Sequence, residues 1–207
     1  MTVERVESLD GKKCRVCFAE GGFLPLSAQE AERLGLSAGR SISRAQFDGL
    51  WQLTERRARE KALLLLKMRD RTRSEMRQKL CQAPFPDGIV EETMAFLEEY
   101  GYLNDERYAA EYVELYRERK SRAELLQALL RRGVGRETAE KALGGCEEAG
   151  AGAAIAAVLR RRGYGREGGE RADQKTVAYL LRRGFSWEEI RRETAHFQAR
   201  EDGVRTL

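Results

Sequence analysis

One short segment recurs along this chain, and it constrains the fold more than any other feature. Leu129–Val134 reads Leu-Leu-Arg-Arg-Gly-Val, and Leu180–Phe185 reads Leu-Leu-Arg-Arg-Gly-Phe, 51 residues later. Val158–Tyr164 is a third version, with three arginines before its glycine. Glycine adopts the left-handed conformation that ends a helix, and arginines in the last turn complement the negative end of the helix dipole. The recurrence therefore predicts a series of helices that each end at a glycine.

Helix-start signals recur between these stops. In a capping box, a Ser or Thr precedes the helix and a Glu or Gln follows three residues later, so that each side chain accepts from a backbone N–H of the first turn. Five pairs fit this pattern and predict five helix starts. They are Ser27 with Glu30, Ser43 with Gln46, Thr72 with Glu75, Ser121 with Glu124, and Ser186 with Glu189.

Apolar residues recur at helical spacing between the starts and the stops. The spacing of Tyr108, Tyr112 and Tyr116 favours packing in a core over stacking on nucleobases. We therefore expect every stripe to face a hydrophobic core. The stripes are Ala58, Ala62, Leu65 and Leu66; Ile89, Phe96, Leu97 and Tyr100; Tyr108, Tyr112, Leu115 and Tyr116; Leu125, Leu126, Leu129 and Leu130; and Trp187, Ile190, Thr194 and Phe197.

The N-terminal residues have the pattern of a small β element. Asp10-Gly11 is a dipeptide favoured in two-residue hairpin turns, and it separates the strand-like runs Val3–Leu9 and Lys12–Phe18. From Ser27 onward the pattern is helical, and no proline that could stop a helix follows Pro86. The sequence thus predicts a mainly α fold with a small N-terminal β-hairpin extension.

The order of starts and stops groups the helices in threes. A three-helix unit of about 40–50 residues cannot bury its apolar face alone, so we expect tandem repeats that stack into an elongated array. The expected domains are an extension with the hairpin and a short helix at 1–50, and three-helix repeats at 51–103, 104–145 and 146–207.

The net charge of +4 averages over segments of opposite sign. Residues 51–80 carry ten Lys/Arg and four Asp/Glu, residues 87–118 carry two and ten, and residues 158–192 carry ten and five. This separation predicts distinct basic and acidic surfaces, with polyanions or an acidic protein as partners. Salt bridges along solvated helices account for the same segments equally well.

The sequence offers little for catalysis or metal binding. Cys14 and Cys17 form a CxxC motif, but residues three apart on a strand point to opposite faces, and a zinc site needs two further ligands. His196 is the one histidine, and no glycine-rich stretch continues into the Gly-Lys-Ser/Thr of a phosphate loop. We therefore expect a protein that is not an enzyme and that needs no metal or cofactor.

The compartment follows from what the chain lacks at its N-terminus. Met1–Arg5 does not lead into the apolar region of a signal peptide, and the longest apolar run, Ala62–Leu66, is far shorter than a membrane span. Four cysteines without a secretory signal are typical of reduced thiols. We expect a cytoplasmic monomer without membrane contact.

A segment near residue 105 resembles the signature of the RecX regulatory proteins. It reads Leu-Asn-Asp-Glu-Arg-Tyr-Ala at 103–109 and follows Phe-Leu-Glu-Glu-Tyr-Gly-Tyr at 96–102. Upstream, Arg71–Leu80 is similar to the first helix of that family, and longer members carry an N-terminal β extension. The resemblance covers about residues 55–200. The signature residues, which we assign mainly to structure, are Leu103, Asp105, Arg107, Tyr108 and Ala109.

The resemblance implies a regulator of recombination and of the DNA-damage response. RecX-like proteins are tandem three-helix modules that bind the RecA recombinase in the groove of its filament on single-stranded DNA. They modulate its ATPase, strand-exchange and co-protease activities without catalysing a reaction. The expected partners are therefore the RecA filament and single-stranded DNA, contacted directly or through the filament, and the expected effect is inhibition.

Basic residues of the repeats are the candidates for contact with the filament or with DNA. Solvated helix surface and helix-end arginines explain the same residues as well as a binding role does. The candidates are Arg69, Arg71, Arg73, Arg77, Lys79, Arg119, Lys120, Arg122, Arg131, Arg132, Arg182 and Arg183.

Two other functions remain open from the sequence. The first is a helix-turn-helix DNA-binding regulator, because Gln127–Arg132 and Glu137–Leu143 are joined by a short turn that contains glycine. The second of these helices presents two carboxylates, Glu137 and Glu140, which are a poor match for a phosphate-lined groove. The other function is a plain helical scaffold, which fits everything except the family signature.

Overall fold

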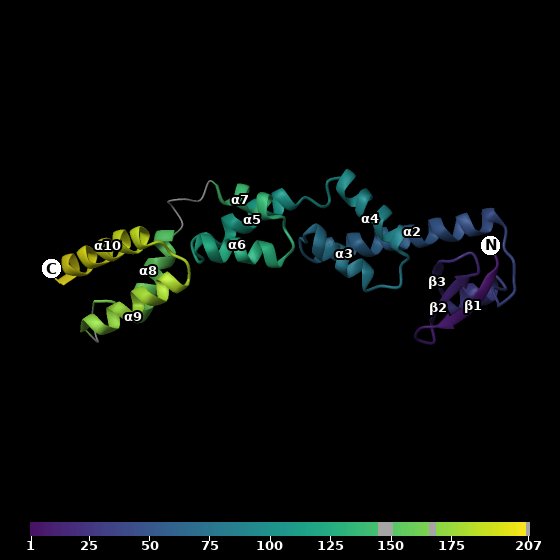
Figure 1. Ribbon diagram of the computed structural model, residues 1–207, viewed down its shortest axis with the longest axis horizontal. Helices are drawn as coiled ribbons and strands as arrows, with labels where there is room; N and C mark the ends of the chain where they lie inside the picture. Colours follow the sequence, from purple (N-terminus) through teal and green to yellow (C-terminus); the bar gives the residue numbers. More distant parts are fainter. Residues whose placement is uncertain (145–150, 166–168, 206–207) are drawn as a thin grey trace. The chain divides into compact units, whose positions relative to one another are not determined.

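The computed structural model describes residues 1–144, 151–165 and 169–205 (Figure 1). These residues form three strands followed by ten helices, so the expected mainly α fold with an N-terminal β element is confirmed. The chain divides into two compact units, Met1–Asn104 and Asp105–Leu207. The elements are β1 (Val3–Ser8), β2 (Lys13–Phe18), β3 (Phe23–Ser27), α1 (Ala28–Arg33), α2 (Arg44–Met68), α3 (Arg73–Cys81), α4 (Asp87–Glu99), α5 (Asp105–Tyr116), α6 (Arg122–Arg131), α7 (Arg136–Leu143), α8 (Ala151–Arg162), α9 (Gly169–Arg182) and α10 (Trp187–Arg205).

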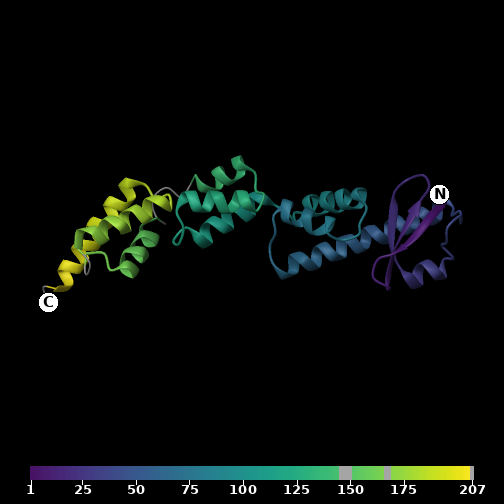
Figure 2. The same cartoon turned by 60° about the horizontal axis from the view of Figure 1, so that its bottom comes forward.

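The N-terminal extension contains a three-stranded antiparallel sheet in the order β1-β2-β3 (Figure 2). The expected hairpin forms its first two strands, in which Val6 is opposite Val16. The third strand adds to that expectation. Gly21 and Gly22 both have positive φ, and they turn the chain so that Leu24 lies opposite Val16 on the other side.

The turn between β1 and β2 is longer than the predicted two-residue turn. The Leu9 N–H donates to the Lys13 carbonyl at 2.9 Å, so three residues lie in the loop instead of two. Gly11 adopts φ 74°, and the Asp10 carboxylate accepts from the backbone of Lys12 and Lys13. Three-residue hairpin loops with one left-handed residue are the next most common class, and Gly11 supplies that residue here.

All five predicted helix starts are confirmed. The side chains of Ser27, Ser43, Ser121 and Ser186 each accept from the backbone N–H three residues on, and the acid or amide at that position accepts from the serine N–H in return. Thr72 is the N-cap of α3, and its Oγ1 accepts from the Glu75 N–H at 3.1 Å. These hydrogen bonds satisfy backbone donors that the helix leaves unpaired.

The glycine stops are confirmed as well, and they share one geometry. Gly133, Gly163 and Gly184 have φ values of 79°, 64° and 85°. In each case the residue after the glycine donates back to a carbonyl five residues earlier, as Val134 does to Leu129 at 3.2 Å. The glycine N–H itself donates to the carbonyl three residues earlier. These two hydrogen bonds together form the Schellman motif, which requires a left-handed residue at the position that glycine occupies.

Each group of three helices encloses its own hydrophobic core. α2, α3 and α4 surround a core that includes Met76, Leu80 and Leu97, α5–α7 surround Leu125, Leu129 and Leu143, and α8–α10 surround Ile155, Leu159, Leu180 and Ile190. Tyr112 is buried, and Tyr108 and Tyr116 pack against it, so this tyrosine stripe faces a core as expected.

Three members of the predicted stripes do not lie in a core. Tyr100, Leu115 and Trp187 are more than half exposed, at 64%, 67% and 58%. Tyr100 and Trp187 stand at the C-cap of α4 and the first residue of α10, where the helical stripe has reached the edge of the packed surface. A stripe predicted from spacing alone extends past the point at which the neighbouring helix ends.

The helix α2 belongs to two cores at once. Ala58 packs with the sheet and α1, whereas Ala62, one turn later, packs with α3 and α4. The expected boundary at residue 50 therefore falls inside this helix, which begins at Arg44. Residues 145–150, where we expected the second repeat to end and the third to begin, lie outside the described residues. None of the described helices combines the length and apolar character that a membrane crossing requires.

Candidate nucleic-acid interface

Two of the candidate arginines project from α3 towards acidic residues of α4. Arg73 forms an ion pair with Glu98, and Arg77 forms one with Glu91. The two arginine side chains are about half exposed, at 57% and 48%. Exposed pairs of this kind contribute about 0–1 kcal/mol, so exchanging the carboxylate for a phosphate costs little. These two arginines are therefore accessible to an anionic partner.

Arg69, at the C-cap of α2, and Lys79, in the last turn of α3, are both exposed. Arg69 Nη2 lies 3.5 Å from Oε2 of Glu75, and Lys79 Nζ lies 3.2 Å from Oε1 of Gln82. Neither contact buries the cation. Together with Arg73 and Arg77 they place four accessible cations on and beside α3.

Arg71 is a correction to the candidate set. Its side chain is buried, with 8% of the residue exposed, and its Nε donates to the Leu65 carbonyl near the end of α2 at 3.5 Å. Thr72, the cap of α3, is buried beside it. Arg71 thus holds the turn between α2 and α3 together, and its guanidinium does not face the solvent as the pattern of basic residues suggested.

The candidates Arg119, Lys120 and Arg122 form a second basic cluster, and most of it serves the fold. Lys120 Nζ donates to Tyr112 Oη at 2.6 Å and lies 4.6 Å from the centre of the Tyr116 ring, a cation–π contact. Arg122 Nη1 donates to the Leu143 carbonyl at the end of α7 at 2.8 Å. Both cations therefore tie the helices of the second repeat together, and Arg119 alone of this cluster projects an exposed side chain without such a contact in the described chain.

The helix-end arginines divide into outward and inward members. Arg131 and Arg182 are exposed in the last turns of α6 and α9. Arg132, one residue later, lies over the Tyr112 ring at 4.7 Å and donates to the Ala128 carbonyl at 3.2 Å. The outward members remain candidates for a partner, whereas Arg132 caps its helix.

Arg183 joins the second repeat to the third. Its guanidinium binds both carboxylate oxygens of Glu124, at 2.7 and 2.6 Å, and donates to the Arg119 carbonyl at 3.0 Å. The Arg183 carbonyl accepts from Ser121 Oγ in return. Burial alone would raise the pKa of Glu124, but the hydrogen bonds from Arg183 and from the Ser121 N–H outweigh it and hold that pKa below its usual range. Arg183 is a structural arginine of this interface.

The structure adds one residue that the sequence did not single out as a candidate. Arg161, in the last turn of α8, lines a pocket of about 240 Å³ together with Arg119, Arg183 and Glu118. Arg161 lies in the third version of the repeated stop segment, which gave a signal for a helix end but none for a site. The pairing of Arg119 with Arg161 across 42 residues depends on how α8 packs, which no local pattern encodes.

The signature segment serves the fold, as expected of its apolar members. Leu103 is 5% exposed and closes the core of α2–α4, whereas Ala109 is fully buried in the core of α5–α7. Asp105 begins α5, where a carboxylate complements the positive end of the helix dipole. Tyr108 stacks on Tyr112 with ring centres 6.3 Å apart, and Arg107 is exposed.

No group of cysteine, histidine and acidic side chains within the described ranges could hold a metal ion. Cys14 and Cys17 are both buried in the sheet, and burial raises the pKa of the Cys14 thiol. Cys146 lies outside the described residues.

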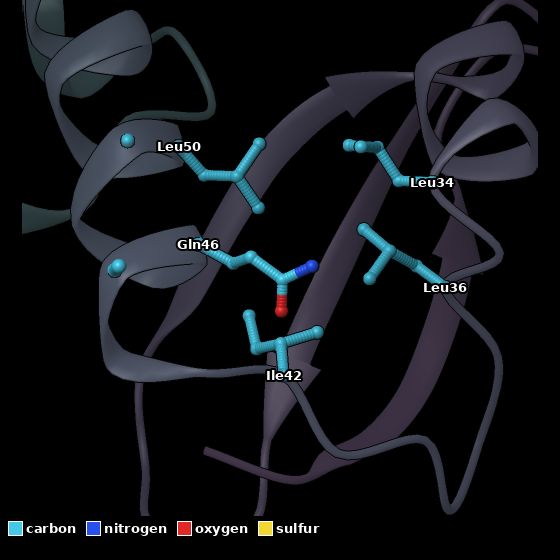
Figure 3. Close-up of a pocket in the computed structure, with 7 residues that line it drawn as sticks. Leu34, Leu36, Ile42, Gln46 and Leu50 are labelled. Atoms are coloured by element: carbon cyan, nitrogen blue, oxygen red, sulfur yellow. The ribbon is translucent and has the colours of Figure 1, made fainter.

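An apolar pocket of about 180 Å³ lies between α1 and the start of α2 (Figure 3). Leu34, Leu36, Ile42 and Leu50 line it, and the one polar side chain that Figure 3 labels, Gln46, has its amide oxygen engaged by the Ser43 N–H at 2.9 Å. Nothing in this pocket can act as an acid, a base or a nucleophile.

The fold and the accessible cations define a protein of tandem three-helix repeats with an N-terminal sheet and basic side chains on its helix ends. Three family models match these repeats: the first three-helix domain of RecX over residues 58–97, the second over 104–143 and the third over 152–192. The chain belongs to the RecX family of regulatory proteins.

Known relatives agree with this assignment. The chain is 29% identical to the regulatory protein RecX of Caldanaerobacter subterraneus subsp. tengcongensis over 188 residues, which cover 88% of this chain and 87% of that protein. It is 31% identical to the RecX of Mycobacterium ulcerans over 64% of this chain and 79% of that one.

Solved structures agree at the level of the fold. A crystal structure of a regulatory protein RecX superimposes with a TM-score of 0.62 at 21% identity, covering 94% of this chain and 98% of the other. RecX from Lactobacillus salivarius gives a TM-score of 0.59 at 21% identity, covering 70% and 97%. The tandem repeats are therefore a shared architecture.

Proposed function

We propose that this protein regulates homologous recombination by binding the RecA filament on single-stranded DNA and inhibiting its ATPase, strand-exchange and co-protease activities. The match of all three repeats to RecX three-helix domains carries the proposal. The exposed cations Arg69, Arg73, Arg77 and Lys79 are compatible with it, because a nucleoprotein filament presents phosphate and carboxylate charge.

Inhibition needs no chemistry from the protein. A ligand that binds one state of a filament more tightly than another shifts the population towards that state, by as much as its two affinities differ. A repeat protein that contacts more than one recombinase subunit would slow the conformational cycle that ATP hydrolysis requires. Its own contribution is binding energy spread over several repeats.

Co-sedimentation separates this function from the alternatives. The full-length protein is mixed with recombinase filaments on single-stranded DNA, with duplex DNA alone, and with free recombinase. We expect the protein to sediment with the filament and to lower its ATPase rate. Sequence-specific binding to duplex DNA would instead support the helix-turn-helix regulator, and no binding would support the scaffold.

Salt dependence tests the electrostatic part of the proposal. If six phosphates of the single strand are contacted, filament affinity falls on the order of 300-fold between about 50 mM and about 200 mM salt, because binding releases the counterions of the DNA. An affinity that hardly changes over this range would contradict a phosphate-contacting role for the exposed arginines.

A further inference from the structure

A polar pocket lies within the Asp105–Leu207 unit, between the second and third repeats. Its walls come from the turn after α5, from α8 and from the end of α9. The volume is about 240 Å³, enough for a phosphate group and part of its sugar. The lining side chains are Glu118, Arg119, Ala154, Ala157, Val158, Arg161 and Arg183.

The three arginines of this pocket are not equivalent. Arg183 is fixed by its two bonds to Glu124, which compensates its charge. Arg119 and Arg161 are exposed, and neither forms an ion pair with a carboxylate in the part of the chain that the structure describes. Two uncompensated guanidinium groups from different repeats therefore meet at one pocket.

The remaining walls determine what can approach. Ala154 and Ala157 present small side chains along α8, which leaves room for a chain that passes close to the helix. Glu118 contributes one carboxylate, which opposes an anion, so two free cations face one acidic group. The balance favours an anion over a cation, and a guanidinium presents paired N–H donors that match the oxygens of a phosphate.

We propose that this pocket binds a phosphodiester of single-stranded DNA directly, with Arg119 and Arg161 each donating to one of its two free oxygens. Arg183, held by Glu124, keeps α9 against α6 and so fixes the distance between the two arginines. The inference rests on the proposed function, because it assigns a DNA contact to a protein that we place on a DNA filament. It deepens that function by assigning a direct DNA contact to one pocket and to two named arginines, Arg119 and Arg161.

The test measures binding of the full-length protein to a fluorescently labelled oligo(dT) by anisotropy, without recombinase. We expect Arg119→Gln and Arg161→Gln each to weaken binding about fivefold at ~0.1 M salt. This is the effect of one lost phosphate contact when the logarithm of affinity falls by about 0.7 per contact for each tenfold increase in salt. The affinity of the double variant for oligo(dT) should be about 25-fold lower, and that affinity should depend less on salt.

A charge-matched control uses arginines of the same unit that lie elsewhere. Arg171 and Arg191 are exposed on α9 and α10, form no ion pair within the described ranges and do not line the pocket. The double variant Arg171→Gln/Arg191→Gln removes the same total charge, and we expect it to bind oligo(dT) within about twofold of the wild type. Circular dichroism checks that all variants retain their helices.

A gain of affinity provides the sharpest outcome. Glu118→Gln removes the one carboxylate of the pocket that opposes an anion, so we expect it to tighten oligo(dT) binding by several-fold. A residue with a purely structural role would not strengthen DNA binding when neutralised.

Three outcomes overturn the inference. The first is a wild type that does not bind oligo(dT), and the second is an Arg119/Arg161 double variant that binds it no worse than the control. The third is a double variant that loses filament affinity but not oligo(dT) affinity, which would place an acidic protein surface on the pocket. The proposed function stands or falls separately, by whether the wild type sediments with the filament.

Discussion

Arg183 and Glu124, 59 residues apart in the sequence, form a bidentate ion pair with Nε–Oε1 and Nη2–Oε2 distances of 2.7 and 2.6 Å. Glu124 is also the acid of the capping box that starts α6, where it accepts from the Ser121 N–H at 2.9 Å. One carboxylate therefore serves two purposes: it caps a helix of the second repeat and anchors the end of a helix in the third.

Breaking this pair should cost more than breaking an exposed one. We expect Arg183→Gln to lower the free energy of unfolding by about 1–3 kcal/mol, because it leaves the partly buried Glu124 carboxylate without its main donor. Arg136→Gln, which breaks an exposed pair with Glu140 on α7, should cost no more than about 0.5 kcal/mol. Urea denaturation followed by circular dichroism measures both, and equal losses would contradict the anchoring role.

The glycine at the same interface allows a second test. Gly184 has φ 85°, and a Cβ added to it would lie 2.5 Å from the Ala123 Cβ. Gly163 has φ 64°, and a Cβ added there would meet nothing within 4 Å. Both alanine substitutions should lower the free energy of unfolding by about 1 kcal/mol, because alanine is strained in the left-handed conformation. Gly184→Ala should lower it by about 1–3 kcal/mol more, because its Cβ clashes with Ala123.

Equal unfolding free energies for the two alanine variants would show that the second and third repeats do not pack this closely in solution. The same denaturation measurement decides this, since both glycines end helices of one unit and differ mainly in the neighbour they meet.

The Met1–Asn104 unit should become less stable in acid, because the Glu30 carboxylate becomes protonated. The hydrogen bond from Arg57, aided by Ser27, lowers the pKa of Glu30 from 4.5 to about 2. Because the folded-state pKa is lowered, the stabilisation is complete above about pH 4.5 and is lost as the pH falls towards 2. We expect the unfolding midpoint of the Met1–Asn104 unit to drop across this window, and to drop less in Glu30→Gln.

The two tryptophans make this acid transition measurable in the full chain. Trp51 lies in α2 and Trp187 in α10, so a Trp187→Phe variant leaves Trp51 as the reporter for the first unit. If the unfolding midpoint of Glu30→Gln falls as steeply between pH 4.5 and 2 as that of the wild type, other carboxylates cause the acid sensitivity.

The basic residues around α3 should separate into binding and structural groups. Arg69→Gln, Arg73→Gln and Arg77→Gln together should weaken inhibition of the recombinase ATPase at least tenfold, because three accessible cations are lost. The helical circular-dichroism signal should stay unchanged. Arg71→Gln should instead lower the unfolding free energy by about 1–3 kcal/mol, since it leaves the turn between α2 and α3 without its buried donor.

If the triple variant lost helicity, its arginines would serve the fold through their pairs with α4. If Arg71→Gln were as stable as the wild type, the buried position of that side chain would be wrong.

Local signals in the sequence determined where the helices begin and end. A capping box or a Schellman motif closes within six residues of chain, and its hydrogen bonds need no partner from elsewhere. For this reason Ser43 with Gln46, and the glycines at 133 and 184, could be assigned before any packing was known. The signature residues Leu103 and Ala109 were likewise expected to be structural, and both are buried.

Only the tertiary structure decided what each arginine does. Successive residues of a helix point about 100° apart, so Arg182 faces the solvent while Arg183 reaches Glu124 in another repeat. Likewise Arg71 is buried and Arg73 is exposed, although both lie in the same basic stretch. The sequence determined the helices, because their ends are local. It could not determine the interface, because burial and pairing depend on side chains that packing brings together from distant helices.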